Sequence, residues 1–290
     1  MKVIVGTRGS KLALAQTKKV VDKLKQEGYE VEIKIVKTTG DIMKDKPLYE
    51  FKGIGAFVRT LDSALAAGKI DIAVHSYKDV PSQRVEGTVV AAVLERDTPR
   101  DALIAKNGES LEELRNGAVV GTSSLRRRVQ LKRLRSDLKF ENLRGNLDTR
   151  LRKLQSGMYD AIVVAEAGLV RLGLDSKVSY QAFPPDVIVP PANQGIIAVA
   201  TRVGEEDLVS FLNDEKTWLE AMVERAVIRE LGVGCAIPVG VYAEASSKVR
   251  LVCEILDAKY IRIDERLSRD SAVSEAAEIA RRLRAEVYGR

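Results

Sequence analysis

The feature that most constrains the fold is a repeated alternation of short apolar runs with segments of helical period. Residues 2–5 form such a run and lead into a helical pattern that ends near Gly28. The same order recurs where residues 118–121 precede residues 125–138, and where residues 160–165 lead into residues 168–171. Strands that alternate with helices predict an α/β fold of largely parallel sheets with covering helices.

Length and composition are those of an ordinary globular protein. The chain has 290 residues, 45% of them hydrophobic and 30% charged, which is enough for two or three domains with their own cores. No apolar run approaches the roughly 18 residues of a membrane span. The first apolar run is also too short for the core of a signal peptide. We therefore expect a cytoplasmic protein without a membrane segment.

The few cysteines and the single histidine argue against several kinds of site. Cys235 and Cys253 lack the paired spacing of a disulfide framework or a zinc site. His75 is the only histidine, so a multi-histidine metal centre or a Ser-His-Asp triad has no support. We expect no bound metal. The net charge of +6 favours acidic ligands but is too dispersed to demand a nucleic acid.

A cluster of arginines opens one of the predicted helices. Residues 121–128 read Gly-Thr-Ser-Ser-Leu-Arg-Arg-Arg, so Ser123 or Ser124 is the expected N-cap and the arginines fall in the first turn. Cations are unfavourable there, because the N-terminal end of a helix is positive. Two interpretations remain open: an anion-binding site of N–H groups, hydroxyls and guanidinium groups, or a solvated basic helix face.

Arginines also follow other predicted strand ends, namely Arg8, Arg144 with Arg150, and Arg171. In open α/β sheets the ligand site lies beyond the carboxyl ends of the strands, so a convergence of these side chains would predict a polyanionic ligand. The chain has no Gly-Lys-Ser/Thr phosphate loop, which leaves polycarboxylates, unusual phosphates and nucleic acids. Aromatic residues make up only 5%, which disfavours single-stranded nucleic acid.

A polar segment, residues 75–81, follows the predicted strand at residues 70–74. It reads His-Ser-Tyr-Lys-Asp-Val-Pro and contains Lys78 and Asp79. The functional interpretation makes Asp79 an acid or base tuned by its neighbour, and the alternative is a surface turn with a solvated Lys-Asp pair. We expect His75 to be a hydrogen-bonded structural residue, because it directly follows the strand and lacks a nearby nucleophile.

The last part of the chain predicts a small α+β domain, with strands at residues 239–243, 249–256 and 260–264 and a final helix at residues 272–287. Cys235 lies in the glycine-rich stretch before these strands, where its thiol is either presented on a loop or buried and inert. Earlier in the chain, Ser110 to Glu113 has the form of a capping box and predicts a short helix that ends at Gly117.

Taken in order, the motifs resemble those of the porphobilinogen deaminase family, whose members are also called hydroxymethylbilane synthases. The resemblance covers nearly the whole chain, and the shared order makes it specific. The segments that carry it are Thr7–Ala13 with Gln16, Ala73–Pro81, Arg96–Asp101, Gly121–Arg127, Leu143–Asn146 with Thr149 and Arg150, Ala167–Leu169 with Arg171–Gly173, Gln194 with Gly195, and Gly234–Pro238.

The resemblance implies two α/β lobes like those of periplasmic binding proteins, followed by a small C-terminal α+β domain. The expected boundaries are residues 1–95 with 196–213 for domain 1, residues 100–190 for domain 2 and residues 217–290 for domain 3. Residues 95–101 and 184–195 are charged or rich in proline, which suits the two crossings between the lobes.

The resemblance also implies a reaction. Members of the family join four porphobilinogen molecules, with loss of ammonia at each addition, and release the linear tetrapyrrole hydroxymethylbilane. The chain grows on a dipyrromethane cofactor attached by a thioether to the residue that matches Cys235. Each pyrrole bears an acetate and a propionate, so the resemblance gives the surplus of arginines a chemical cause. It further implies a monomer whose partner is a small polycarboxylate substrate.

By the family's pattern, Asp79 protonates the departing amino group and stabilises the cation that forms. The cofactor would be held by Ser76, Lys78, Thr122, Ser124, Arg126, Arg127 and Arg150. The substrate side would be lined by Arg8, Ser10, Phe57, Arg144, Arg150, Arg171 and Gln194. Thr39, Ile54 and Tyr77 depart from residues common in the family, which affects the expected mobile loop at residues 44–55 but neither Asp79 nor Cys235.

Two other classes of protein compete with this assignment. A non-catalytic binding protein for an anionic solute would share the two-lobed pattern, but it needs neither the cysteine nor the Lys78 and Asp79 pair. A nucleic-acid-binding protein would use the basic residues 126–135 and would bind generic DNA or RNA in a salt-sensitive way. We expect no nucleic-acid partner.

Overall fold

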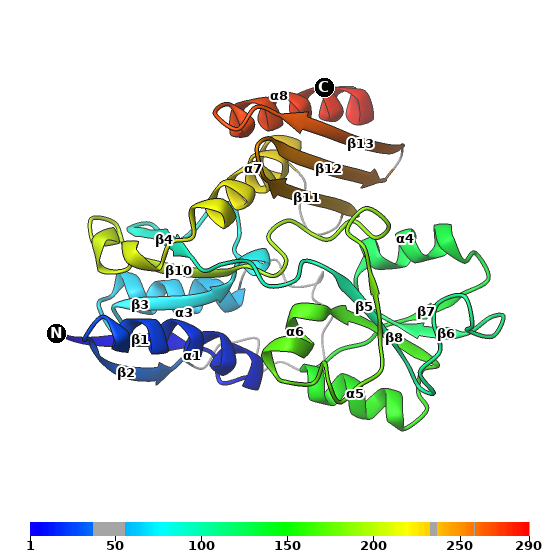
Figure 1. The fold of residues 1–290 in the computed structure, drawn as a ribbon, viewed down its shortest axis with the longest axis horizontal. Helices are drawn as coiled ribbons and strands as arrows, with labels where there is room; N and C mark the ends of the chain where they lie inside the picture. Colours follow the sequence, from blue (N-terminus) through cyan, green and yellow to red (C-terminus); the bar gives the residue numbers. More distant parts are fainter. Residues whose placement is uncertain (37–55, 233–236, 258, 290) are drawn as a thin grey trace. The chain divides into compact units, whose positions relative to one another are not determined.

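The computed structural model describes residues 1–36, 56–232, 237–257 and 259–289 (Figure 1). Its contacts divide the chain into two compact units. The first unit contains Met1–Asp97 and Gly195–Leu219, and the second contains Thr98–Gln194 and Glu220–Arg290. The second sheet and the C-terminal sheet thus belong to one unit, and the division into three domains stays a prediction.

The first unit is built on a five-stranded mixed sheet with the strand order β2-β1-β3-β10-β4. Its strands are β1 (Lys2–Thr7), β2 (Glu30–Ile35), β3 (Ile72–Ser76), β4 (Thr88–Val93) and β10 (Ile197–Arg202). The strand β1 runs parallel to β2 and β3, whereas β10 runs antiparallel to both of its neighbours. Two short 3-10 turns, η3 (Glu206–Leu208) and η4 (Ser210–Leu212), follow β10.

Two helices of the first unit cover opposite faces of this sheet. Helix α1 (Lys11–Gln26) buries Val20 and Leu24 in a cluster with alternate side chains of the strands, such as Val5. Helix α3 (Ala56–Ala66) buries Leu61 in a separate cluster with Ala73. Because successive side chains of a strand point to opposite faces, the two clusters lie on the two sides of the sheet.

The second unit repeats this plan with the strand order β7-β6-β8-β5-β9. Its strands are β5 (Asp101–Ala105), β6 (Val119–Gly121), β7 (Lys139–Glu141), β8 (Ala161–Ala165) and β9 (Gln181–Phe183). Helix α4 (Leu125–Leu134) packs on one face, and α5 (Leu147–Gln155) and α6 (Glu166–Arg171) pack on the other. The strand β6 is parallel to β7 and β8, and β5 is antiparallel to both of its neighbours.

Both sheets are therefore largely parallel, as predicted, but each contains one reversed strand. The reversed strands, β5 and β10, are the first strands after the chain passes from one unit to the other, at Thr98 and at Gly195. A parallel connection needs a crossover within the same sheet, usually through a helix. Since each of these strands enters its sheet from the other unit, the sequence pattern within one sheet did not reveal its direction.

The C-terminal part is the predicted α+β arrangement. It consists of α7 (Glu215–Leu231), the antiparallel strands β11 (Val239–Ala245), β12 (Val249–Leu256) and β13 (Tyr260–Leu267), and α8 (Ala272–Tyr288). Within the second unit, β11 packs directly on the segment that follows β9. The N–H of Val241 donates to the carbonyl of Pro190 at 2.8 Å. A Cβ added to Gly240 would lie 2.7 Å from the carbonyl oxygen of Val189, so this close approach requires glycine.

The helix predicted after Ser110 is wrong, although its capping box forms. The N–H of Ser110 donates to the Glu113 carboxylate at 2.8 Å, and the N–H of Glu113 lies 3.4 Å from the Ser110 hydroxyl. The chain then continues as turns. The guanidinium of Arg135 binds the carbonyls of Leu111 at 2.8 Å and Leu114 at 3.1 Å, and a helix would have used the carbonyl of Leu111 for its own hydrogen bond.

Candidate anion-binding and catalytic site

The predicted site residues are divided between the two units. The first unit contains Arg8, Ser10, Phe57, Ser76, Lys78 and Asp79. The second contains Thr122, Ser124, Arg126, Arg127, Arg144, Arg150, Arg171, Gln194 and Cys235. Each unit brings most of its own set to the carboxyl edge of its sheet, while convergence between the two sets stays a prediction.

In the first unit, parallel strands place the predicted residues at one edge of the sheet. Arg8 follows β1, and Ser76 ends β3. The amide Nε2 of Gln16 in α1 donates to the hydroxyl of Ser76 at 2.7 Å, which joins the helix to this edge. Ser10 is the N-cap of α1, and its hydroxyl accepts the N–H of Ala13 at 3.2 Å.

Lys78 and Asp79 lie in a short 3-10 turn, η2 (Tyr77–Asp79), directly after β3. Both side chains are exposed, whereas Tyr77 between them and the sheet is buried. The segment 75–81 was expected to be a loop, and only its central residues form this turn. The arrangement presents an ammonium group and a carboxylate outward from the sheet edge, where they can meet a ligand.

His75 is the hydrogen-bonded structural residue that the sequence predicted. Its imidazole is buried, and Nε2 lies 3.0 Å from Oδ1 of Asp62 in α3. The same oxygen accepts a hydrogen bond from Arg84 at 2.7 Å. Burial lowers the pKa of His75, although the charge of Asp62 opposes this shift. The sequence reasoning missed Asp62, whose only local signal is a charged residue on the apolar face of a helix.

In the second unit, the predicted helix start after β6 forms as a polar junction. Ser124 is the N-cap of α4, and its hydroxyl accepts the N–H of Arg127 at 3.4 Å. The Thr122 hydroxyl accepts the N–H of Ser124 at 3.2 Å. The hydroxyl of Ser123 donates to the carbonyl of Leu143 at 2.8 Å, so this junction lies beside the next one, between β7 and α5.

Arg126 and Arg127 are not part of a solvated helix face. Both side chains are buried, and both bind Asp101 at the start of β5, with N–O distances of 2.7 Å to its two oxygens. Arg126 also donates to the carbonyl of Val189 at 2.7 Å, and Arg127 donates to the carbonyl of Val163 at 3.0 Å. The compensating anion that cations in a first helical turn require is thus supplied by the chain itself.

Among the described residues, this cluster keeps one unsatisfied hydrogen-bond donor. Burial alone would raise the pKa of Asp101, but the charges of Arg126 and Arg127 hold it far below its usual range. The charge of a second buried carboxylate, Glu254, also acts on Arg126. The Nε of Arg127 is buried and has no hydrogen-bond partner. A buried guanidinium donor without a hydrogen-bond partner suits an additional anion.

Gln194 was expected to line the substrate side, but its side chain does not point outward. Its side chain is fully buried, and Nε2 donates to Oδ1 of Asp101 at 2.9 Å and to the carbonyl of Pro99 at 2.7 Å. It therefore joins the two segments that connect the units. The neighbouring Asn193 has a φ of 62°, and its N–H donates to the carboxylate of Glu224 in α7 at 2.5 Å.

Of the other arginines, one follows a strand and two lie in the helices that come after strands. Arg144 follows β7, and Arg171 is the last residue of α6; both are half-buried. Arg150, in α5, donates from Nε to the carbonyl of Gly145 at 2.8 Å. Gly145 has a φ of 110°, which a residue with a side chain rarely adopts, so glycine is required in this turn.

Several predicted features lie outside the described residues, namely Cys235, Thr39, Ile54, residues 44–55 and the side chain of Phe57. The second cysteine, Cys253, is described. It is buried in the middle strand of the C-terminal sheet, and burial raises the pKa of its thiol to about 12. A thiol of this kind is inert, because the thiolate is the reactive form.

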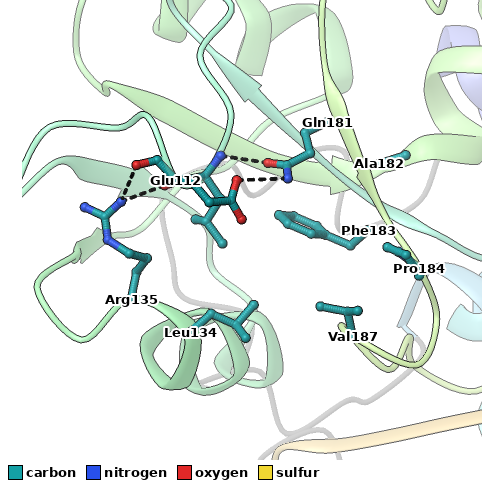
Figure 2. Close-up of a pocket in the computed structure, with 9 residues that line it drawn as sticks. Glu112, Leu134, Arg135, Gln181, Ala182, Phe183, Pro184 and Val187 are labelled. Atoms are coloured by element: carbon teal, nitrogen blue, oxygen red, sulfur yellow. Dashed lines mark hydrogen bonds between the residues drawn. The ribbon is translucent and has the colours of Figure 1, made fainter.

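Other places for a ligand are less suited to an anion. A pocket of about 340 Å³ beside α4 is lined by Leu134, Phe183, Pro184 and Val187 together with polar residues (Figure 2). Its polar groups mainly bind one another. For example, the amide of Gln181 donates to the Glu112 carboxylate at 3.3 Å. No predicted site residue lines it. Among the described residues, no cluster of three potential metal ligands occurs.

Comparisons with known proteins agree with one another along the whole chain. Residues 3–210 match the family model "Porphobilinogen deaminase, dipyromethane cofactor binding domain", and residues 218–289 match "Porphobilinogen deaminase, C-terminal domain". A "Probable porphobilinogen deaminase" of Archaeoglobus fulgidus is 79% identical and covers 100% of both chains. One of Methanocella arvoryzae is 47% identical, over 96% of this chain and 93% of the relative.

Solved structures are more distant. A periplasmic substrate-binding protein of an ABC transporter from Coxiella burnetii is 18% identical, with a TM-score of 0.45, over 74% of this chain and 94% of that chain. The mixed α/β class rests on the strand order of the two sheets and not on this likeness.

Proposed function

The chain belongs to the porphobilinogen deaminase family and is a transferase of tetrapyrrole biosynthesis, and within that reaction we propose that Asp79 is the acid and Cys235 the attachment point of the dipyrromethane cofactor. The substrate is porphobilinogen, which loses ammonia as each unit is added to a linear tetrapyrrole. The observation that carries the proposal is the buried Asp101, Arg126 and Arg127 cluster, because its unsatisfied Arg127 Nε suits a carboxylate of the ligand.

The residues present fit a dipyrromethane group. The unsatisfied Nε of Arg127 offers a donor to a carboxylate, and the neighbouring N-cap of α4 offers the hydroxyls of Thr122 and Ser124. Arg150, Ser76 and Lys78 complete the proposed set. When bound, the group supplies the terminal pyrrole to which the first substrate is joined.

The attachment to Cys235 is supported by elimination. The chain has two cysteines, and the other one, Cys253, is 1% exposed in β12 with a thiol pKa raised to about 12. A side chain inside a sheet cannot carry a pyrrole without disrupting the core of the C-terminal sheet. Cys235 lies in the glycine-containing stretch between α7 and β11.

Asp79 is proposed to move the protons of the reaction. Its carboxyl group donates a proton to the amino group of porphobilinogen, the carbon–nitrogen bond breaks with its electron pair going to nitrogen, and ammonia leaves. The resulting carboxylate stabilises the cation that remains on the substrate. The carboxylate then accepts the proton released when the new carbon–carbon bond forms. The exposure of Asp79 at the sheet edge allows this contact with substrate.

The substrate carboxylates are proposed to bind on the remaining strand-end residues. These are Arg8, Ser10, Arg144, Arg150 and Arg171, while the ring of Phe57 is proposed to pack against a pyrrole. The resemblance to the family implied that Gln194 belongs to the same group. Its buried hydrogen bonds to Asp101 and Pro99 favour a supporting role, in which it holds the arginine cluster in place.

The mass of the intact protein tests this assignment. We expect the active protein to carry the mass of two pyrrole units, and the adduct to map to the peptide that contains Cys235. Cys235→Ser should lack the added mass, and the matched variant Cys253→Ser should keep it. An active protein of unmodified mass, or an adduct on Cys253, would contradict the proposal.

Cellular location and assembly remain part of the proposal. Within the described part of the chain, none of the helices combines the length and apolarity needed to cross a membrane. We expect a monomer in the cytoplasm that uses no nucleic-acid partner. The alternative of a non-catalytic binding protein for an anionic solute rests on resemblance of the fold, and loss of ammonia from porphobilinogen on incubation with the protein would exclude it.

A further inference from the structure

One buried oxygen atom connects both ends of the segment that carries Asp79. Oδ1 of Asp62 accepts from Nη2 of Arg84 at 2.7 Å and lies 3.0 Å from Nε2 of His75. His75 immediately precedes this segment, and Arg84 immediately follows it. Asp62 belongs to α3, which precedes this segment in the chain, and it is fully buried.

The segment between these two anchors is residues 76–83. Its centre is the 3-10 turn η2, a structure with poorer hydrogen-bond geometry than an α-helix. Lys78 and Asp79 project from it into solvent. The N-terminal flank of this turn is the buried end of β3. On the C-terminal side Val80 is buried, and Arg84 binds Asp62.

The protonation of the three groups follows from their surroundings. Burial keeps the pKa of His75 below its ordinary value, so the imidazole is neutral near pH 7. Arg84 can only donate to Asp62, and an acceptor oxygen 3.0 Å from Nε2 of a neutral imidazole requires the proton on Nε2. Asp62 therefore selects one tautomer of His75, and the same oxygen also binds Arg84.

Burying these charged groups costs desolvation free energy. The second oxygen of Asp62 is buried without a hydrogen-bond partner in the part of the chain that the structure describes. Apolar residues of similar volume often stabilise a core as well as a buried ion pair does. Stability alone is a weak explanation for this ion pair, whereas the fixing of a particular loop conformation explains its position.

We propose that Asp62 is a positioning residue, which holds the segment with Lys78 and Asp79 in its reactive conformation by binding His75 before it and Arg84 after it. The inference rests on the proposed role of Asp79 as the acid. It adds a residue that never touches the substrate. Removing the carboxylate charge leaves Asp79 intact but places its turn incorrectly, and a misplacement of about 1 Å can lower a rate by about 100-fold.

The kinetic test uses Asp62→Asn in the protein that carries its cofactor. We expect kcat to fall by about 10- to 100-fold with a smaller change in KM, at a temperature where the variant is folded. Asp71→Asn is the matched control. Asp71 lies before the other end of β3, accepts the N–H of Ile4 at 2.9 Å and binds Arg202 at 3.1 Å. Its loss should lower thermal stability and leave kcat unchanged.

The second readout does not depend on activity. Because His75 is the only histidine in the chain, its imidazole nitrogens give an isolated NMR signal. The wild-type protein should show the neutral tautomer with the proton on Nε2, and Asp62→Asn should lose this preference. His75→Gln, which keeps a donor of similar reach, should retain more activity than His75→Ala.

The two hypotheses fail in different ways. If Asp79→Asn turns over normally, the proposed acid is wrong, whatever the behaviour of Asp62 variants. If Asp79→Asn is inactive while Asp62→Asn keeps both kcat and the tautomer of His75, the positioning role is wrong and the acid stands. The positioning role would also be overturned if Asp71→Asn lost as much stability as Asp62→Asn and showed the same fall in kcat.

Discussion

The side-chain amide of Gln194 donates a 2.9 Å hydrogen bond to Oδ1 of Asp101, the same oxygen that binds Arg127 at 2.7 Å. Gln194 belongs to one of the segments that connect the two units, and Asp101 follows the other. The two connections are therefore linked to each other and to the arginines of α4 through one carboxylate. Changes to this carboxylate should affect the stability of the unit and its binding of anions together.

Asp101→Asn should destabilise the protein strongly. The substitution leaves Arg126 and Arg127 buried without their shared anion, and breaking a buried pair typically costs about 3–5 kcal/mol. Urea unfolding measures the loss. The control is Asp264→Asn, which breaks a half-exposed pair with Arg250 and should cost about 0–1 kcal/mol. Equal losses for the two variants would contradict the importance of the buried cluster.

Arg127→Lys should weaken assembly of the cofactor although the charge is conserved. The guanidinium of Arg127 binds Asp101 and the carbonyl of Val163, and its Nε stays available to a ligand. The ammonium group of lysine can reach one oxygen, but it lacks this planar set of donors. Intact mass should show a smaller fraction of protein with two pyrrole units. Arg133→Lys, in the same helix, is the control and should load normally. Full loading of Arg127→Lys would remove this residue from the cofactor site.

Asp79→Asn should abolish most turnover without preventing binding. The amide cannot donate the required proton, and loss of a general acid typically lowers the rate by about 10²–10⁴-fold. Steady-state kinetics should show the loss in kcat, and near pH 7 the tautomer of His75 should be unchanged because Asp62 is intact. Asp22→Asn, which alters an exposed acid of α1 paired with Lys18, should be fully active.

Stability should fall as the pH is lowered past the ordinary pKa of histidine. Burial lowers the pKa of His75 in the folded chain, and the charge of Arg84 lowers it further. The charges of Asp62 and Asp79 oppose this shift. The unfolded chain therefore binds a proton near pH 6.5 while the folded chain does not. This contribution is complete above that pH and is lost progressively below it.

Urea unfolding between about pH 7 and pH 5 checks this dependence. His75→Gln should show a flatter profile than the wild type in this range. Carboxylates such as Asp101, whose pKa is lowered by the two arginines, lose their contribution only at more acidic pH. An identical slope in the wild type and in His75→Gln would show that another group is responsible.

Local patterns predicted much of the fold correctly. Hydrophobic periodicity placed α4 and the strands beside it, and hydroxyl residues before the arginines placed its N-cap, which is Ser124. The position of His75 at the end of an apolar strand predicted a buried, hydrogen-bonded side chain. These features depend on residues within a few positions of one another, so they are visible in the sequence.

Residues that act through distant partners were missed. Asp101 and Asp62 appear in the sequence as ordinary charged residues, and no local pattern shows that they bind Arg126 and Arg84, respectively. The helix predicted after Ser110 fails for the same reason, since Arg135 occupies its carbonyl groups from 24 residues away in the chain. The partners become neighbours only after the sheet has formed.

The sequence by itself determined where strands end, where helices begin and that cations collect at those junctions, because backbone geometry and capping act over a single turn. It also determined the family, because many short motifs occur in one order. The tertiary structure alone decided that Arg126 and Arg127 share Asp101 and that Asp62 holds both flanks of the Asp79 segment. Buried charges must be paired, and which pairs form depends on the packing of elements that are far apart in the chain.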